Sequence, residues 1–159
     1  MSDLQLTNVD GKGFDLTHDG YDLVLGDGLV EALVHSIFRD GRAPAGSIPA
    51  ADDPRGHWAS TLETAAPDGS LLWLLQREAI TSAMPGRVAD ALKAACAWMI
   101  DSTEGVLAAV TDVDAVASKA ARRGAIESTL DVHLAVAPYR RQFEIVYSPT
   151  TQTYQLTEV

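Results

Sequence analysis

The stretch Ile126-Glu127-Ser128-Thr129-Leu130-Asp131-Val132-His133-Leu134-Ala135-Val136 decides the fold of this chain. Apolar and polar residues alternate along it. The apolar set is Ile126, Leu130, Val132, Leu134 and Val136, and the polar set is Glu127, Thr129, Asp131 and His133. Such alternation is typical of a β-strand that buries one face and wets the other. We therefore expect a strand of an antiparallel sheet here.

Further strands are predicted on both sides of this stretch. Val106 to Val116 is expected to be its partner strand, and Phe143, Ile145 and Tyr147 form a third alternation. The residues Ser148-Pro149-Thr150-Thr151 predict a turn, after which Tyr154 and Leu156 mark a fourth strand. Residues 143–159 therefore predict a terminal β-hairpin within a meander of about four strands.

The first hundred residues show helical spacing instead. Val30, Leu33, Val34 and Ile37 recur on one helical face and predict a helix at about 28–39, with Asp27 as its N-cap. A short helix is predicted for Leu71–Ala79, capped by Ser70, with Trp73 in the core. A third is predicted to open at Thr81 or Ser82, with Pro85 in its first turn, and to end near 101–105. Helices followed by a run of strands predict an α+β domain, with N-terminal helices packed on a C-terminal antiparallel sheet.

The remaining segments set the domain organisation. Residues 1–20 are rich in Gly, Asp and Thr and predict an N-terminal arm, which leaves 21–159 as a single α+β domain. Residues 41–69 carry four prolines and predict a long loop. Because a disordered linker rarely keeps an indole, Trp58 indicates that this loop packs locally or has a function.

Composition excludes several classes of function. The chain has 22 acids and 12 bases, a net charge of -10, which disfavours binding to nucleic-acid phosphates or to anionic membranes. We expect no signal peptide in the acidic, polar first residues, and the longest apolar run, Leu71 to Leu75, is too short to span a bilayer. Cys96 is the only cysteine and is expected to be a small buried apolar residue.

No catalytic or metal-binding pattern emerges. The four histidines are scattered singly, and no nucleophile elbow is present. Asp112, Asp114 and Asp131 could hold a hard cation on adjacent strands, or they could form a solvated strand face. Gly26-Asp27-Gly28 precedes a helix but lacks the spacing of a phosphate-binding loop. We therefore expect no cofactor, no metal and no enzymatic activity.

Several stretches, in this order, resemble a known family. They are Tyr21–Leu29 (YDLVLGDGL), Phe38-Arg39-Asp40 followed by Arg42-Ala43-Pro44, Asp53–Trp58 (DPRGHW), Gly69–Arg77 (GSLLWLLQR) and Ala95–Met99 (ACAWM). Over residues 20–147 the chain resembles the Mu-type phage baseplate wedge family. That family is related to the lysozyme-like baseplate protein of T-even phages and to the sheath-initiator subunit of type VI secretion systems.

The resemblance implies a structural subunit of a contractile tail baseplate, located in the virion and present in several copies around the tail axis. The implied partners are other wedge proteins, the central hub and tail tube proteins, and the tail sheath protein. The C-terminal strands would pair with extended arms of the sheath. Members of the family usually have two aromatics in the loop where this chain has His57-Trp58, and the T-even and secretion relatives carry a Glu-Pro-Arg motif where it reads Glu104-Gly105-Val106.

Seven residues are candidates for binding a partner: Arg55, Trp58, Phe143, Ile145, Tyr147, Tyr154 and Leu156. Arg55 and Trp58 are either interface anchors or a plug that closes the loop over the helices. The terminal hairpin is either a docking edge or the completion of the domain's own sheet. Two other functions stay open: a peptidoglycan-cleaving enzyme of the tail, or the same part in a bacterial contractile injection particle.

Overall fold

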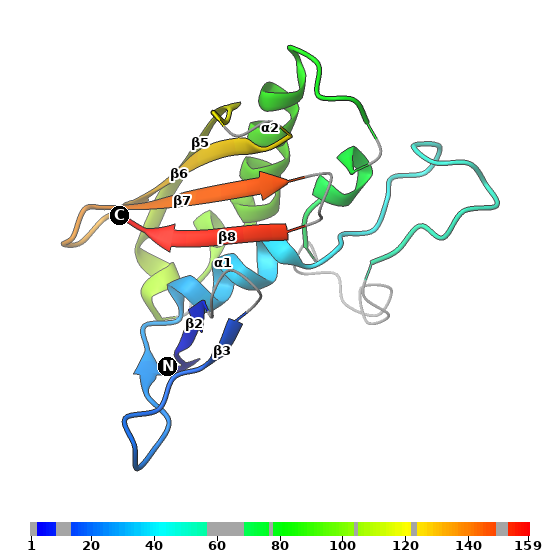
Figure 1. Cartoon of the computed structure of the whole chain (residues 1–159). Helices are drawn as coiled ribbons and strands as arrows, with labels where there is room; N and C mark the ends of the chain where they lie inside the picture. The colour runs from blue at the N-terminus through cyan, green and yellow to red at the C-terminus, as the bar shows by residue number, and fades with distance from the viewer. Residues whose placement is uncertain are drawn as a thin grey trace.

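The computed structural model describes residues 3–8, 14–56, 69–76, 78–103, 105–121, 124–148 and 153–159 (Figure 1). The predictions for His57, Trp58 and Glu104, and for the side chain of Tyr154, lie outside the described part. No helix in these ranges is long and apolar enough to cross a membrane.

The C-terminal part of the chain forms a four-stranded antiparallel sheet in the order β5-β6-β7-β8. Its strands are β5 (Val110–Lys119), β6 (Ile126–Leu134), β7 (Arg140–Ser148) and β8 (Thr153–Glu158). Along β6 every second residue from Ile126 to Leu134 is buried, as the alternation predicts. The predicted α+β class and the four-stranded meander are confirmed.

Two strand boundaries differ from the prediction. The strand predicted at Val106–Val116 begins only at Val110, because Gly105–Ala109 form the 3-10 helix η4. Val136, predicted to point into the core, is 55% exposed. It lies in the turn that follows β6, which closes when the N–H of Leu134 donates to the carbonyl of Tyr139 (2.9 Å).

Two helices pack on the sheet. α1 (Leu29–Phe38) confirms the predicted first helix, although its N-cap residue is Gly28, while the carboxylate of Asp27 accepts the N–H of Leu29 (3.0 Å). α2 (Met84–Cys96) carries Pro85 in its first turn as predicted, and the 3-10 helix η3 (Ala97–Asp101) extends it. Neither Thr81 nor Ser82 caps α2; its N-cap is Ala83, which makes no side-chain cap bond.

The helix predicted at Leu71–Ala79 is a single 3-10 turn, η2 (Leu72–Leu75). With three residues per turn, Leu72 and Leu75 lie on the same side, and both are buried. Trp73 is only partly buried, because its indole Nε1 reaches outward and donates to the carbonyl of Gly41 (2.8 Å). The predicted cap Ser70 is not the N-cap residue, which is Leu71, although Ser70 Oγ accepts the N–H of Leu72 (3.4 Å).

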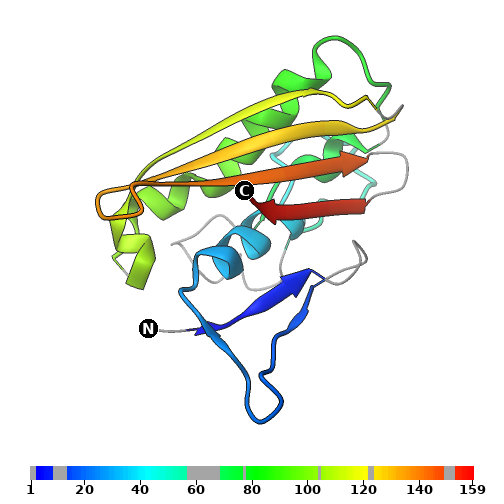
Figure 2. The same cartoon turned by 60° about the vertical axis from the view of Figure 1, so that its left-hand side comes forward.

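The core lies between the sheet and the helices, with α2 across one face of the sheet and α1 beside β8 (Figures 1 and 2). Its largest fully buried side chains come from every layer: Tyr147, Phe143, Leu29, Leu33, Ile37, Leu72, Met84, Leu92, Met99, Ile126, Leu130 and Ile145. Cys96 is fully buried, as predicted, and its burial raises the pKa of the thiol to about 12.

The N-terminal residues form short strands below α1. β1 (Asp3–Leu4) pairs with β4 (Leu25–Gly26), and β2 (Leu6–Asn8) pairs with β3 (Phe14–Leu16). Two contacts join them to α1: the Phe14 ring stacks on Phe38, with 5.3 Å between the ring centroids, and the N–H of Leu6 donates to buried Glu31 Oε1 (3.0 Å). The predicted arm is thus built of short β-ladders that rest on a helix.

Candidate interaction surface

β8 forms one edge of the main sheet, and its backbone has a free side. The N–H of Val159 donates to the carbonyl of Gln142 (3.0 Å), so residues 153, 155 and 157 are the ones that bond β7. In an antiparallel ladder the intervening residues point their N–H and C=O groups the other way. The backbone groups of Tyr154, Leu156 and Glu158 therefore face outward, and no strand of the described ranges pairs with them.

A groove of about 560 Å³ runs beside this edge, between β8 and the N-terminal strands. Apolar side chains from five different elements line it, together with Gln5 and polar side chains of β2 and β8. The lining residues are Gln5, Leu6, Thr7, Phe14, Val30, Phe143, Gln155, Leu156, Thr157 and Glu158. An extended chain laid here would meet unpaired backbone groups on one side and an apolar floor beneath.

The predicted partner-binding residues of the sheet point into the domain. Phe143, Ile145 and Tyr147 are each at most 1% exposed, and Leu156 is 6% exposed. The Tyr147 hydroxyl donates to the carbonyl of Leu72 (3.3 Å). These side chains belong to the core between the sheet and the helices, and of them Phe143 and Leu156 also line the groove beside β8. Their role in partner binding stays a prediction.

Arg141 holds the edge strand in place, and the sequence prediction missed it. Its guanidinium donates to both carboxylate oxygens of Glu158 on β8 (2.6 and 2.8 Å) and also bonds Asp27 before α1. The hydrogen bond to Glu158 and the nearby charge of Asp27 raise the pKa of Arg141 against its partial burial. The sequence contains one signal for this role. Arg141 lies at the same alternate positions of β7 as the buried residues Phe143 and Ile145, where a charged residue needs a partner.

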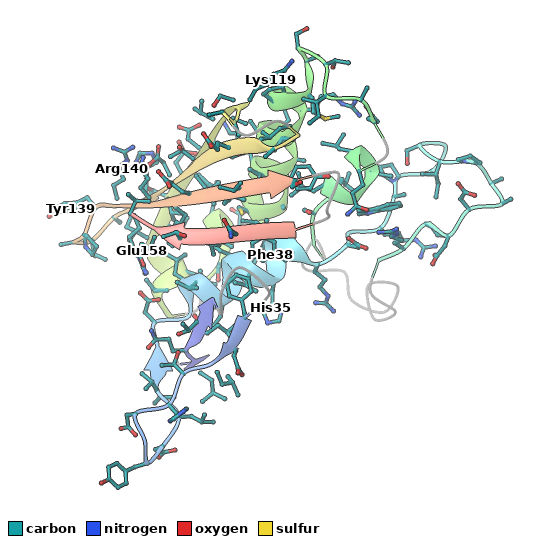
Figure 3. All side chains as sticks on the ribbon, viewed as in Figure 1. His35, Phe38, Lys119, Tyr139, Arg140 and Glu158 are labelled. Atoms are coloured by element: carbon teal, nitrogen blue, oxygen red, sulfur yellow. The ribbon has the colours of Figure 1, made fainter. Side chains whose placement is uncertain are left out.

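The opposite edge, β5, is protected. The ladder between β5 and β6 is irregular at Val110 and Asp112, and Lys119 stands at the end of the strand (Figure 3). Lys93 of α2 reaches Asp114 on β5 with 2.7 Å between Nζ and Oδ1, which raises the pKa of the lysine and lowers that of the aspartate. Bulges and edge lysines hinder further strand pairing. Strand pairing is therefore hindered at the β5 edge of the sheet but not at the β8 edge.

Two of the three possible cation ligands on these strands have cationic partners, and the third, Asp112, accepts the N–H of Val113 (2.9 Å). Asp114 and Asp131 lie opposite each other on β5 and β6, but Asp114 bonds Lys93 and Asp131 bonds Arg140 (2.7 Å). Within the described ranges no group of three or more His, Cys, Asp or Glu residues could hold a metal ion. This part of the strand face is a set of surface ion pairs.

Arg55 connects the long loop to the end of α1. Its Nη1 lies 2.7 Å from Asp40 Oδ2, and its guanidinium stacks over the Trp73 ring at 4.5 Å from the ring centroid. Asp53 Oδ1 accepts the N–H of Arg55 (2.9 Å), which stabilises the left-handed backbone of Arg55 (φ 52°). For Arg55 these contacts correspond to the loop-plug alternative, since its guanidinium holds the loop on Asp40 and on the Trp73 ring.

Gly56 follows Arg55 in the Asp53–Trp58 stretch. Both its backbone conformation and the lack of space for a side chain require a glycine there. It has φ 88°, and a Cβ added there would lie 2.7 Å from Cβ of Arg42. Asp53, Arg55 and Gly56 thus each have a role within the chain itself. Arg55 remains 38% exposed at the side chain, so a partner could still reach it.

The fold and the edge define an α+β domain with an open-edged antiparallel sheet. Residues 29–141, from the first residue of α1 to the second residue of β7, match the family described as "Phage protein GP46". The chain belongs to the Phage protein GP46 family. No curated protein and no solved structure matches it.

Proposed function

We propose that the chain is a structural subunit of a contractile phage tail baseplate, which links wedge and hub and starts sheath assembly by strand pairing at β8. The observation that carries the proposal is the outward-facing edge of β8 beside the 560 Å³ groove. Membership in a phage protein family and the resemblance to Mu-type wedge proteins support it. The proposal assigns the chain no catalytic step.

The asymmetry of the sheet supports the choice of edge. A sheath arm that arrives as an extended strand needs free N–H and C=O groups in register, together with space for alternate side chains. β8 offers both, whereas β5 carries an irregular ladder and an ion pair to α2. One usable edge would let a strand add with a single polarity and position, as a sheath that starts in register requires.

The partners follow from this role: other wedge proteins, hub and tube proteins, and the sheath protein, with several copies of the chain around the tail axis of the virion. Genes for a spike, a larger wedge protein and a sheath beside this one would support the proposal. The same genes in a bacterial chromosome without a phage head would favour a contractile injection particle. Clearing of cell wall in a zymogram by the purified protein would contradict a purely structural role.

The edge can be tested without removing it. Deleting residues 149–159 would also remove Leu156 from the core and Glu158 from Arg141, so point variants are sharper. Tyr154→Pro removes an N–H that faces away from β7, and proline is tolerated in an edge strand when its missing N–H faces solvent. Tyr154→Val changes the same side chain and keeps that N–H.

We expect baseplates carrying Tyr154→Pro to lose sheath growth in vitro, counted by electron microscopy, while Tyr154→Val baseplates grow sheath normally. The unfolding midpoints of the two purified variants should agree with each other to within a few degrees, since both keep the backbone pairing with β7. Normal sheath growth on Tyr154→Pro baseplates would contradict docking at this edge.

A further inference from the structure

The hairpin of residues 14–26, which we call the finger, projects away from the body of the molecule (Figures 1 and 2). It carries an unusual share of the exposed apolar surface. Of the ten large apolar side chains exposed in the described ranges, four lie in the finger, Leu16, Tyr21, Leu23 and Leu25, and a fifth, Leu4, lies opposite Leu25 on β1. Exposed apolar groups gathered on one projection are typical of interaction sites rather than of scattered surface residues.

The register places the four leucines on one face. Leu4 lies opposite Leu25 in the ladder of β1 and β4, and Leu23 lies opposite His18. Residues two apart on a strand share a face, so Leu16 joins His18, and Leu23 joins Leu25. Near the body, Leu6 and Phe14 continue this face over α1, where the domain covers it. The outer half is the bare leucine face of Leu4, Leu16, Leu23 and Leu25.

The tip of the finger holds its shape. Asp19 Oδ1 accepts the N–H groups of Tyr21 (2.8 Å) and Asp22 (2.9 Å), and His18 Nδ1 accepts the N–H of Gly20 (3.2 Å). The hydrogen bonds from Asp22 and Tyr21 lower the pKa of Asp19, so its carboxylate stays ionised at neutral pH. Gly20 supplies the positive φ of 101° that the turn needs. The turn presents the Tyr21 ring fully exposed to solvent (101%).

The charge of the finger specifies what can bind it. Residues 14–38 contain five acids and no lysine or arginine. Asp27 pairs with Arg141, and Glu31 is buried. The carboxylates of Asp15, Asp19 and Asp22 form no ion pair within the described ranges, and accept only backbone N–H groups there. Asp15 lies on the strand face opposite the leucines, and Asp19 and Asp22 lie in the turn at the tip. A cleft that encloses the finger must therefore also neutralise these three carboxylates.

We propose that the finger is a docking element that inserts Tyr21 and the leucine face into an apolar cleft rimmed by lysine and arginine on a different subunit of the same particle. The proposal rests on the proposed function only in taking the partner from the assembled particle. Because the turn already fixes the backbone around Tyr21, binding would have to order only the side chain, which suits this tyrosine as an anchor. The β8 edge and the finger would then bind two different partners.

The first experiment locates the partner. The chain with p-benzoylphenylalanine at position 21 is incorporated into particles, which are then irradiated and analysed by mass spectrometry. The same analogue at position 139 is the control, since Tyr139 is 70% exposed on the β6–β7 turn (Figure 3). We expect position 21 to form an adduct with one other particle protein, on a segment with lysine or arginine, and position 139 not to form it. An adduct between two copies of this chain, or none, would overturn the proposal.

The second experiment separates apolar from charged contributions. Tyr21→Ala with Leu23→Ser should lower incorporation into particles roughly tenfold or more, the scale of losing a hot-spot residue. Asp15→Asn with Asp22→Asn keeps the oxygens that accept the backbone N–H groups and removes two charges. It should lower incorporation several-fold, most strongly at low salt. The unfolding midpoints of both variants should match the native chain, because these side chains are exposed.

The outcomes distinguish this inference from the proposed function. Normal incorporation of both variants would overturn the role of the finger and leave the β8 proposal standing. Absence of the native chain from purified particles would overturn the proposed function, and the finger proposal with it. Loss of incorporation by the Tyr21 variant alone, with no effect of the Asp variants, would contradict the cationic rim.

Discussion

At the scale of single residues, the fold is best tested at Gly69, a glycine with backbone atoms packed closely against it. Gly69 has φ +95°, and a Cβ there would lie 2.2 Å from the carbonyl oxygen of Arg39, at the junction of loop and α1. We expect Gly69→Ala to lower the free energy of unfolding by about 2–4 kcal/mol, from left-handed strain plus overlap. Chemical denaturation followed by circular dichroism would measure this loss.

The control for Gly69 is Gly46. It also has a positive φ (+83°) but meets no atom within 4 Å. Gly46→Ala should therefore cost only the conformational strain, about 1 kcal/mol. Equal losses for both variants would mean that the contact with Arg39 contributes nothing.

At the scale of elements, Arg141 joins β7, β8 and the start of α1. Arg141→Lys keeps the charge but cannot donate the paired hydrogen bonds to Glu158. We expect stability to fall by about 1–3 kcal/mol, the range for hydrogen bonds to charged groups. In the Arg141→Lys variant, the β8 amides that bond β7 should exchange hydrogen faster than the amides of β6, as measured by NMR.

The matched comparison is Arg87, which pairs with Glu78 on the surface with half of its side chain exposed. Arg87→Lys should change stability by less than about 1 kcal/mol, as is usual for exposed pairs. If the Arg141 variant behaves in the same way, β8 is held by its backbone ladder alone.

At the scale of the whole molecule, the N-terminal strands rest on a body that is complete without them. Every fully buried member of the core cluster lies at Leu29 or later, and Phe14 is the one earlier residue packed against it in the described part. A chain that starts at Asp27 should unfold in one cooperative transition, with a loss of about 3–5 kcal/mol for the missing Phe14 contact and the missing hydrogen bond from Leu6 to Glu31. Calorimetry would check both. Loss of cooperative unfolding would show that the first 26 residues belong to the folding unit.

Sequence patterns determined the fold class and most of the elements. The alternation from Ile126 to Leu134 reports one buried face of a sheet, and the spacing of Val30, Leu33 and Ile37 reports one face of a helix. Both signals are local, because the period at which apolar residues recur is set by the backbone geometry of neighbouring residues. Phe143, Ile145, Tyr147 and Leu156 were correctly located on strands for the same reason.

Tertiary structure alone decided which surface is free. The strand order makes β8 an edge strand whose amides face outward. Arg141 bonds Glu158 and Asp27, which lie 17 and 114 positions away in the sequence. The leucine face of the finger is exposed because α1 covers only the inner end of the short ladders, at Leu6 and Phe14. An apolar strand residue looks the same in sequence whether or not the fold covers it, since burial depends on what packs against it from elsewhere in the chain.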